Sequence, residues 1–509
     1  MSAWAPSSSW WTPTRPNYLR RRRSADRYNR ACRHRPRSGN AMPRNAIPPR
    51  IPSRIQPLQQ NLQNNSTDLC NGNPLTVVSS PQSLGSGTAK KADAGFYLDA
   101  KRYINGTLVK YRYSARGCMS YSLPDQFELA KQCRDRFFTL NPSLDAVVTD
   151  DPVHIGYLSG YRSILHDCGP YPQALIASRE RVALVTGASD AAAALEVLGD
   201  PGMIWRYGTF FVFSSGDFPS YREMPAASRT PTAALTAAIA ATVGGLQNIG
   251  SDLSQPDLIA AVEKMVPSAR LAPAAEGFRR SRAIKLVGEL DMLRYVSQLT
   301  DKAVERAAGL IRPGVNELEI AAEITQTITV GAGICRFVVV TSGERSSRVD
   351  AYARNRLLQE GDLVRMDIGA SVNGYCSDMA RTYGVGDPGP LARDRYNALL
   401  RGENRELESI RPGIPAGTVF EAAMNEVRSG ALPDYQRSHC GHGIGLQAHE
   451  FPLIGPSSET LLESGMVLCV ETPYYEIGWG GMMVEDTAIV NDTGYELLTN
   501  ASRELFQPT

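Results

Sequence analysis

The sequence is poor in histidine and lacks the features of several protein classes. Six histidines occur in 509 residues. Nine cysteines are scattered without a C-x-x-C pair, so neither a disulfide framework nor a zinc ribbon is indicated. No stretch approaches about 18 consecutive apolar residues, so no membrane span is predicted. The amino terminus has no apolar segment before a small-residue cleavage site, so we expect a reducing, cytoplasmic location.

Positive charge is concentrated at the amino terminus. Residues 1–60 contain 13 arginines, no lysine and one acid, Asp26, which gives a net charge of +12. The whole chain has a formal net charge of +2, so the remainder sums to −10 (2 − 12), as is ordinary for an enzyme. Residues 1–117 lack apolar periodicity and are predicted to form a disordered basic and polar extension. A basic tail can bind nucleic acid, but we expect an appendage without that role.

Helical and strand patterns alternate after the extension. Residues 118–267 are predicted to form an α/β domain, in which His154 and His166 are expected to be structural. Residues 268–282 are rich in proline, alanine and arginine and are predicted to be a linker. Residues 283–509 are predicted to form a second, mixed α/β (α+β) domain that begins with a long amphipathic helix.

The second domain contains a weak internal repeat. The segments "IRPGVNELEIAAEI" and "IRPGIPAGTVFEAAMNEV" begin at positions 311 and 410. Each is predicted to end one helix at Pro-Gly and to start another behind a capping box. Asn316 with Glu319 forms the predicted box in the first copy, and Thr418 with Glu421 forms it in the second. The duplication predicts two related half-domains.

Each copy continues into an apolar strand that carries acids. The segments "GDLVRMD" and "GMVLCVE" end in Asp367 and Glu471, and two further acids, Asp378 and Glu485, follow 11 and 14 residues later. An Asn-Gly dipeptide predicts a tight hairpin that pairs the strands of the first two acids. The glycine-rich "EIGWGGMM" predicts an equivalent turn in the second copy. Four carboxylates are therefore expected at one pseudo-twofold centre.

Four buried carboxylates require a counter-charge, because like charges repel and an unpaired charge is costly to bury. A dinuclear metal site resolves this problem. The stretch "HCGHGIGLQAHE", residues 439–450, contains three of the six histidines and can supply an imidazole ligand. Carboxylate-rich ligation with one imidazole suits Mn²⁺, Fe²⁺, Co²⁺ or Zn²⁺.

These motifs resemble those of a known family. "MDIGASVNGYCSDMART", "HCGHGIGLQAHE", "VET" and "MVEDT" look like the successive motifs of the pita-bread metallopeptidases, which include methionine aminopeptidases, Xaa-Pro aminopeptidases, prolidases and creatinase. The resemblance covers about 280–500. Residues 120–265, with "VVTDDPVHIGYLSGY", are similar to the creatinase/prolidase amino-terminal domain. The resemblance implies a pita-bread catalytic domain, a smaller α/β domain before it, and a homodimer.

The resemblance also assigns roles to individual residues. It implies five ligands for two divalent ions, with manganese the first choice: Asp367, Asp378, His442, Glu471 and Glu485. Asp378 and Glu485 would bridge the ions, Glu471 would also shuttle a proton, and His449 would contact the substrate. A metal-bridging hydroxide would attack a peptide carbonyl. His439 is a candidate substrate-binding residue whose role stays open.

Two positions depart from the family pattern. Asp350 stands where the family usually has a histidine, and an anionic carboxylate does not donate a hydrogen bond. Met483 replaces an arginine of the proline-specific members. Asp350 is therefore a candidate catalytic residue in a changed role, as a base or as the partner of a cationic substrate group. Arg345 and Arg348 are candidates for binding a substrate carboxylate.

Three functions remain open. The first is a metal-dependent hydrolase of the Xaa-Pro dipeptidase or aminopeptidase type, acting on small peptides. The second keeps the fold and metals but acts on a small non-peptide molecule, as a creatinase-like C–N hydrolase or a dimethylsulfoniopropionate-type lyase, and Asp350 and Met483 favour it. The third is a non-catalytic binding protein, which only the arginine-rich tail favours and which the five retained ligands oppose.

Overall fold

The computed structural model describes residues 97–104, 107–114, 119–120, 123–210, 212, 220–242, 247–265 and 270–505. The chain divides into two units, Met1–Lys90 and Lys91–Thr509. All the described residues belong to the second unit. No helix of the described ranges is both long and apolar enough to cross a lipid bilayer.

The predicted extension contains a small sheet at its end. β1 (Tyr97–Ile104), β2 (Thr107–Ser114) and β3 (Met119–Ser120) pair antiparallel in that order. The prediction that residues 97–104 and 107–114 lack structure is therefore wrong. The sequence contains the missed signal, because "TLVKYRYS" partly alternates polar and apolar residues and an Asn-Gly dipeptide precedes it. The rest of the predicted disordered segment lies outside the described residues.

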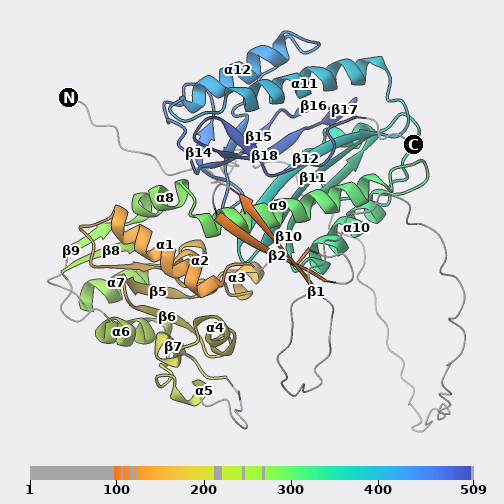
Figure 1. The fold of residues 1–509 in the computed structure, drawn as a ribbon. Coiled ribbons are helices and arrows are strands. Elements are labelled where there is room, and N and C mark those ends of the chain that lie inside the picture. The colour runs from red at the N-terminus through yellow and green to blue at the C-terminus, as the bar shows by residue number, and fades with distance from the viewer. Residues whose placement is uncertain are drawn as a thin grey trace, which may run out of the picture. The chain divides into compact units, whose positions relative to one another are not determined.

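A six-stranded sheet with the order β7-β6-β5-β4-β8-β9 forms the centre of the first α/β region (Figure 1). Its strands are β4 (Ala146–Thr149), β5 (Ala174–Ser178), β6 (Val182–Gly187), β7 (Ile204–Tyr207), β8 (Asn248–Asp252) and β9 (Arg270–Pro273). Its helical elements are α1 (Gln126–Leu140), α2 (Pro152–Ser159), α3 (Leu165–Cys168), α4 (Ala191–Leu198), η1 (Pro201–Met203), α5 (Ser220–Glu223), α6 (Pro231–Thr242) and α7 (Pro256–Met265).

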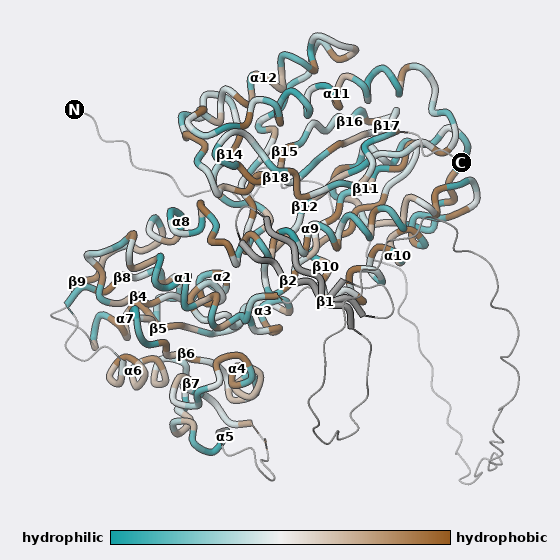
Figure 2. The backbone as a smooth tube through the Cα atoms, in the orientation of Figure 1, coloured by the Kyte–Doolittle hydropathy of each residue, from teal (hydrophilic) through white to brown (hydrophobic). Residues whose placement is uncertain are grey.

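Both faces of this sheet are buried, which explains its continuous apolar strands. Val148 and Ile176 pack with α6 and α7 on one face, whereas Val147 and Leu175 pack with α1 and α2 on the other. In Figure 2 the tube of α6 is mostly brown to white, as expected for a helix that covers an apolar surface. The predicted alternation of helices and strands over 118–267 is thus present.

The segment predicted as a linker, 268–282, is largely regular structure. β9 is the parallel edge partner of β8, and α8 (Ala275–Ala283) follows it. Phe278 of α8 is fully buried against Phe137 of α1, with ring centroids 4.5 Å apart. Alanine and arginine are good helix formers, so the composition that suggested a linker also suits a helix. The domain limits themselves stay a prediction.

The second, carboxy-terminal half of the chain forms an eight-stranded sheet with the order β10-β11-β12-β18-β15-β13-β14, to which β19 adds beside β18. The strands are β10 (Ile334–Ser342), β11 (Leu363–Val372), β12 (Tyr375–Gly384), β13 (Gly441–Gly443), β14 (Glu450–Ile454), β15 (Val467–Glu471), β18 (Glu485–Val490) and β19 (Tyr495–Leu497). β16 (Tyr474–Glu476) and β17 (Gly480–Met482) form a separate hairpin, and η2 (Gly343–Ser347) follows β10. The predicted mixed α/β class is confirmed.

Two pairs of helices accompany the two halves of this sheet. α9 (Val287–Ala308) and α10 (Glu317–Val330) contact β10, β11 and β12, whereas α11 (Pro390–Ser409) and α12 (Ala416–Arg428) contact β15 and β14 (Figure 1). The capping box of Asn316 and Glu319 is confirmed. The second box is wrong, because α12 begins after Pro415 without a side-chain cap. Residues 458 and 460 supply carbonyl acceptors for its first N–H groups instead.

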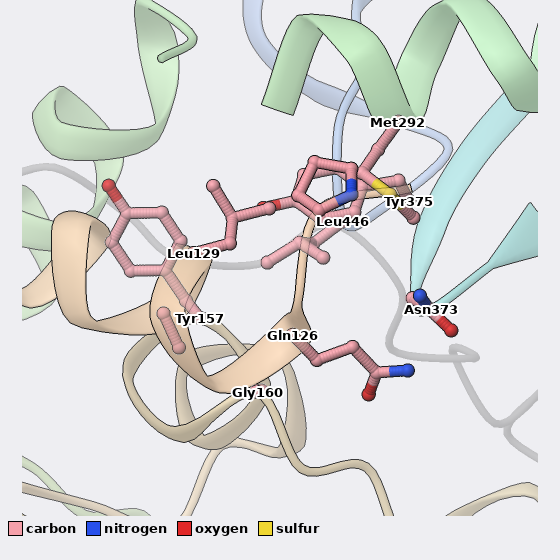
Figure 3. A pocket seen from close by; sticks show the side chains of 11 residues that line it. Gln126, Leu129, Tyr157, Gly160, Met292, Asn373, Tyr375 and Leu446 are labelled. Atoms are coloured by element: carbon pink, nitrogen blue, oxygen red, sulfur yellow. The ribbon is translucent and has the colours of Figure 1, made fainter. Parts of the chain in front are cut away.

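Apolar packing joins α1 and α2 to the elements of the eight-stranded sheet. One buried cluster continues from these helices into α9, β11 and β12. A cavity of about 20 Å³ lies at this junction, and Leu129, Met292, Tyr375 and Leu446 are among the side chains that line it (Figure 3). It has room for about one water molecule and is too small for a substrate. The functional cleft must therefore lie elsewhere.

Candidate metal centre and active site

The first two predicted ligands lie on a tight hairpin. Asn373 and Gly374 have φ angles of 50° and 88°, as a two-residue turn with right-handed strand twist requires. In the resulting register Asp367 pairs with Ala380, and Asp378 pairs with Gly369. The two acids are therefore diagonal neighbours on one face of the β11–β12 ladder.

The second half brings its acids together more directly. Glu471 of β15 lies opposite Glu485 of β18, and His442 of β13 lies opposite Cys469 of β15. Ala380 of β12 pairs with Glu485 and joins the halves. The glycine-rich segment is more than the predicted turn, since it forms the β16–β17 hairpin. The predicted pairing of the two acidic strands is nevertheless present.

Three predicted ligands form a compact buried group. Ligand atoms of Asp378, His442 and Glu485, together with Sγ of Cys469, all lie within 4.8 Å of one another. His442 Nε2 lies 4.0 Å from Asp378 Oδ2, and His442 Nδ1 lies 3.1 Å from the carbonyl oxygen of Gly443. A carbonyl only accepts, so Nδ1 carries the proton and the Nε2 lone pair faces the carboxylates, as a metal ligand requires.

The charges of this group call for a cation. Burial, reinforced by neighbouring carboxylates, raises the pKa of Asp378 and of Glu485 well above the usual range. Burial likewise raises the pKa of Asp367 to about 6, against the effect of Arg365. Burial and the nearby His449 lower the pKa of His442 to about 4, so its imidazole is neutral at pH 7. Buried acids beside a neutral imidazole are a donor set that fits divalent metal ions.

The other two predicted ligands have basic side chains as partners. Glu471 Oε1 lies 3.2 Å from His439 Nε2, and Glu471 Oε2 lies 3.5 Å from Arg437 Nη2. Although burial raises the pKa of Glu471, these partners bring it below its usual value. Asp367 Oδ2 lies 3.3 Å from Arg365 Nη1, and the Arg365 side chain is 0% exposed. His439, whose role the sequence left open, thus contacts a predicted ligand.

All five predicted ligands line one cleft of about 560 Å³. Its lining also includes the other predicted catalytic residues, Asp350 and His449, together with His439 and Met483. The rings of His442 and His449 lie 4.0 Å apart. Met483 is 5% exposed, and its sulfur accepts a hydrogen bond from the Tyr475 hydroxyl at 3.5 Å. An uncharged thioether thus stands where the proline-specific members have an arginine.

The expected carboxylate-binding role of Arg345 and Arg348 is not supported. Neither side chain lines the cleft. Arg345 instead contacts the fully buried Glu317, which also accepts hydrogen bonds from the backbone of Ser342 at the end of β10 and of Arg354. Arg348 uses its backbone carbonyl to accept a 3.0 Å hydrogen bond from Arg365. A buried acid captures the nearest guanidinium, because an unpaired buried charge is unfavourable.

The structure adds four residues that the sequence reasoning missed: Arg336, Arg437 and Tyr475 line the cleft, and Cys469 belongs to the compact buried group. Cys469 precedes Glu471 by two residues, so the period of a strand places both on one face. Arg437 precedes the histidine motif by two residues and was detectable as part of it. Arg336 and Tyr475 carry no local signal, since only the tertiary fold brings them to the cleft.

Buried acids and an imidazole at the centre of a duplicated sheet define a metallohydrolase of the pita-bread fold. The model of metallopeptidase family M24 matches residues 291–492. The chain is 31% identical to the uncharacterized peptidase YqhT of Bacillus subtilis over 248 residues, which cover 48% of this chain and 70% of that protein. The chain belongs to metallopeptidase family M24.

Two further similarities concern prolidases. The chain is 34% identical to a Xaa-Pro dipeptidase of Pyrococcus furiosus over 226 residues, which cover 44% of this chain and 65% of that relative. The solved prolidase structure from Pyrococcus furiosus superposes with a TM-score of 0.56 and 25% identity, over 72% of this chain and all of that one. This superposition extends beyond the family model into the first α/β region.

Proposed function

We propose that this protein is a dinuclear metal peptidase of the Xaa-Pro dipeptidase or aminopeptidase type. The observation that carries the proposal is the convergence of all five predicted ligands, from both half-domains, on one cleft. Asp367, Asp378, His442, Glu471 and Glu485 would hold the ions. The bound metals would supply Lewis-acid polarisation of the scissile carbonyl and lower the pKa of water.

The side chains around the ligands have distinct tasks in this proposal. Glu471 moves the proton, because it is ionised and is held in place by His439 and Arg437. His449 contacts the substrate from beside His442. Asp350, an exposed carboxylate on the cleft wall, attracts the cationic amino terminus of a peptide.

A second candidate is hydrolysis or lysis of a small non-peptide cation. Asp350 favours it, because this carboxylate occupies the position where the family resemblance led us to expect a hydrogen-bond donor. Met483 favours it too, since the cleft has no arginine there to bind a proline carboxylate. A guanidino or sulfonium group would satisfy the same acid.

A substrate panel tests both candidates. Metal-loaded protein would be offered Xaa-Pro dipeptides, longer Xaa-Pro peptides, and small guanidino and sulfonium compounds. Peptide turnover that fails on chelation and returns with Mn²⁺ or Co²⁺ supports the first candidate. Turnover of the small cations alone would rule it out. Asp350→His should increase Xaa-Pro cleavage, and an unchanged rate would remove Asp350 from the account.

Three finer features belong to the same proposal. Manganese as the preferred metal and a homodimer rest on the family resemblance, whereas a cytoplasmic location rests on the nine scattered cysteines, which suit a reducing compartment. Competition among Mn²⁺, Co²⁺, Zn²⁺ and Fe²⁺ during reconstitution tests the first. Light scattering of the metal-loaded protein tests the second, with a monomer as the contradicting result. Fractionation of the producing cells tests the third.

A further inference from the structure

A chain of buried polar contacts links the six-stranded sheet to the loop that carries His449. His154 Nδ1 lies 2.6 Å from Asp252 Oδ2 of β8. His154 Nε2 lies 3.1 Å from Arg282 Nη1 of α8. Arg282 Nη2 contacts Glu450, and it also donates to Gln447 Oε1 at 2.8 Å. His154 and Arg282 are only 9% and 8% exposed, so solvent competes little with these contacts.

The proton positions in this chain follow from its chemistry. A guanidinium group only donates, so the His154 Nε2 that faces Arg282 must accept. Nδ1 then carries the proton and donates to Asp252, which also accepts from Thr149 Oγ1 at 3.0 Å. The His154 ring stacks on Phe278, one turn before Arg282 on α8, at a centroid distance of 3.8 Å. Both contacts therefore fix Arg282 in one orientation.

The loop after His442 is built around the carboxylate at the end of this chain. Glu450 accepts a hydrogen bond from the Gln447 backbone at 3.0 Å and lies 3.5 Å from Lys285 Nζ. A Cβ atom on Gly445 would lie 2.8 Å from the Glu450 oxygens, so glycine permits this close approach. Leu446 anchors the same loop in the junction cavity of Figure 3.

His449 depends on this loop for its position. Among the described residues, no hydrogen bond to its side chain is present in the structure, and its ring contacts His442. A second cleft of about 270 Å³ lies behind it and is lined by His154, Arg282 and Glu450. His449 lines both this cleft and the metal cleft, so it separates the two.

We propose that Arg282 is a positioning residue. His154 and Asp252 orient its guanidinium group, which binds Glu450 and thereby fixes His449 in the cleft that the five predicted ligands line. The proposal rests on the proposed function, in which His449 contacts the substrate. It assigns to the first α/β region a part in the catalytic site. Arg282 acts through the loop and does not line the cleft that holds the predicted ligands.

Hydrogen exchange of the full-length protein tests the positioning directly. Arg282→Met should speed amide exchange in residues 444–450 by about tenfold, because the loop loses its cross-domain partner. Arg280→Met is the matched control: it removes the same charge from α8, and Arg280 donates its hydrogen bonds to Leu140 and Asn141, away from the loop. Equal exchange in Arg282→Met and wild type would overturn the proposal.

A double-mutant cycle separates positioning from general damage. Arg282→Met should lower kcat by about 10–100-fold with little change in KM, and Arg282→Lys should recover part of the loss. In a His449→Ala background, Arg282→Met should cost less than about twofold more. Fully additive losses would refute the coupling. If wild type and Arg280→Met both lack peptidase activity, the proposed function fails, while the exchange experiment still decides the positioning.

Discussion

The two halves of the catalytic sheet place their acids by different means. In the first half a tight hairpin makes Asp367 and Asp378 diagonal neighbours on adjacent strands. Arg365 forms an ion pair with Asp367. In the second half Glu471 and Glu485 are direct cross-strand partners separated by an inserted hairpin. In each half, one acid thus pairs with an arginine, Asp367 with Arg365 and Glu471 with Arg437. No ion pair with an arginine or lysine is present for the other acid of each half, Asp378 or Glu485, among the described residues.

The two halves agree at the acids that the proposal places between the metals and differ at the other two. The inner acids, Asp378 and Glu485, lie in the same compact group with His442. The other two acids, called outer here, have different partners: Asp367 pairs with a buried arginine, whereas Glu471 pairs with His439 and Arg437. A peptidase mechanism needs one outer acid that is free to exchange protons, and only the partners in the second half are part-exposed.

The largest expected effect is a loss of activity that is equally large when the inner acid of either half is replaced. Asp378→Asn and Glu485→Gln should each lower kcat/KM by about 1000-fold or more, because each removes a charge that would hold both metals. Metal content measured after dialysis should fall in parallel. If one variant keeps full metal content and activity, the two inner acids are not equivalent.

A smaller loss of activity is expected when the outer acid of the second half, Glu471, loses one of its partners. Arg437→Met should lower kcat by about 10–100-fold, because Glu471 loses a partner that orients it. Arg395→Met is the control: this neighbouring arginine packs over Trp479 and pairs with Glu476. Its removal should change kcat less than about twofold. Comparable losses in both variants would show that surface charge alone matters.

The turns of the two halves should differ in their tolerance of a side chain. Gly374 (φ 88°) and Gly478 (φ 91°) both have left-handed backbone. A Cβ on Gly374 would meet Arg162 at 2.6 Å, whereas nothing lies within 4 Å of one on Gly478. Gly374→Ala should cost about 2 kcal/mol and Gly478→Ala about 1 kcal/mol. Urea unfolding measures both, and equal costs would contradict the crowding at Arg162.

The smallest effect concerns a buried acid beneath the first half. Burial raises the pKa of Glu289 to about 7 from 4.5, against the hydrogen bond from Leu286 N–H. Because the folded-state pKa is raised, its contribution to stability is full below pH 4.5 and is lost as the pH rises through 7. Glu289→Gln should therefore gain about 1–3 kcal/mol relative to wild type between pH 5 and 8.5. A pH-independent difference would contradict this assignment.

The sequence predicted those parts of the molecule that depend on local patterns. The Asn373-Gly374 turn fixed a register, and that register placed Asp367 and Asp378 on one face. The capping box of Asn316 was local and correct. The Thr418 box was wrong because segment 458–460, remote in sequence, satisfies the helix start. Arg345 was misassigned for a similar reason, since its partner Glu317 lies 28 residues away.

Metal stoichiometry tests the central claim most directly. Wild-type protein dialysed against Mn²⁺ and then freed of unbound ions should retain about two metal equivalents per chain by mass spectrometry. Asp378→Asn and Glu485→Gln should retain fewer than one. Less than about half an equivalent in the wild type, with no activity gained from Mn²⁺ or Co²⁺, would contradict the account.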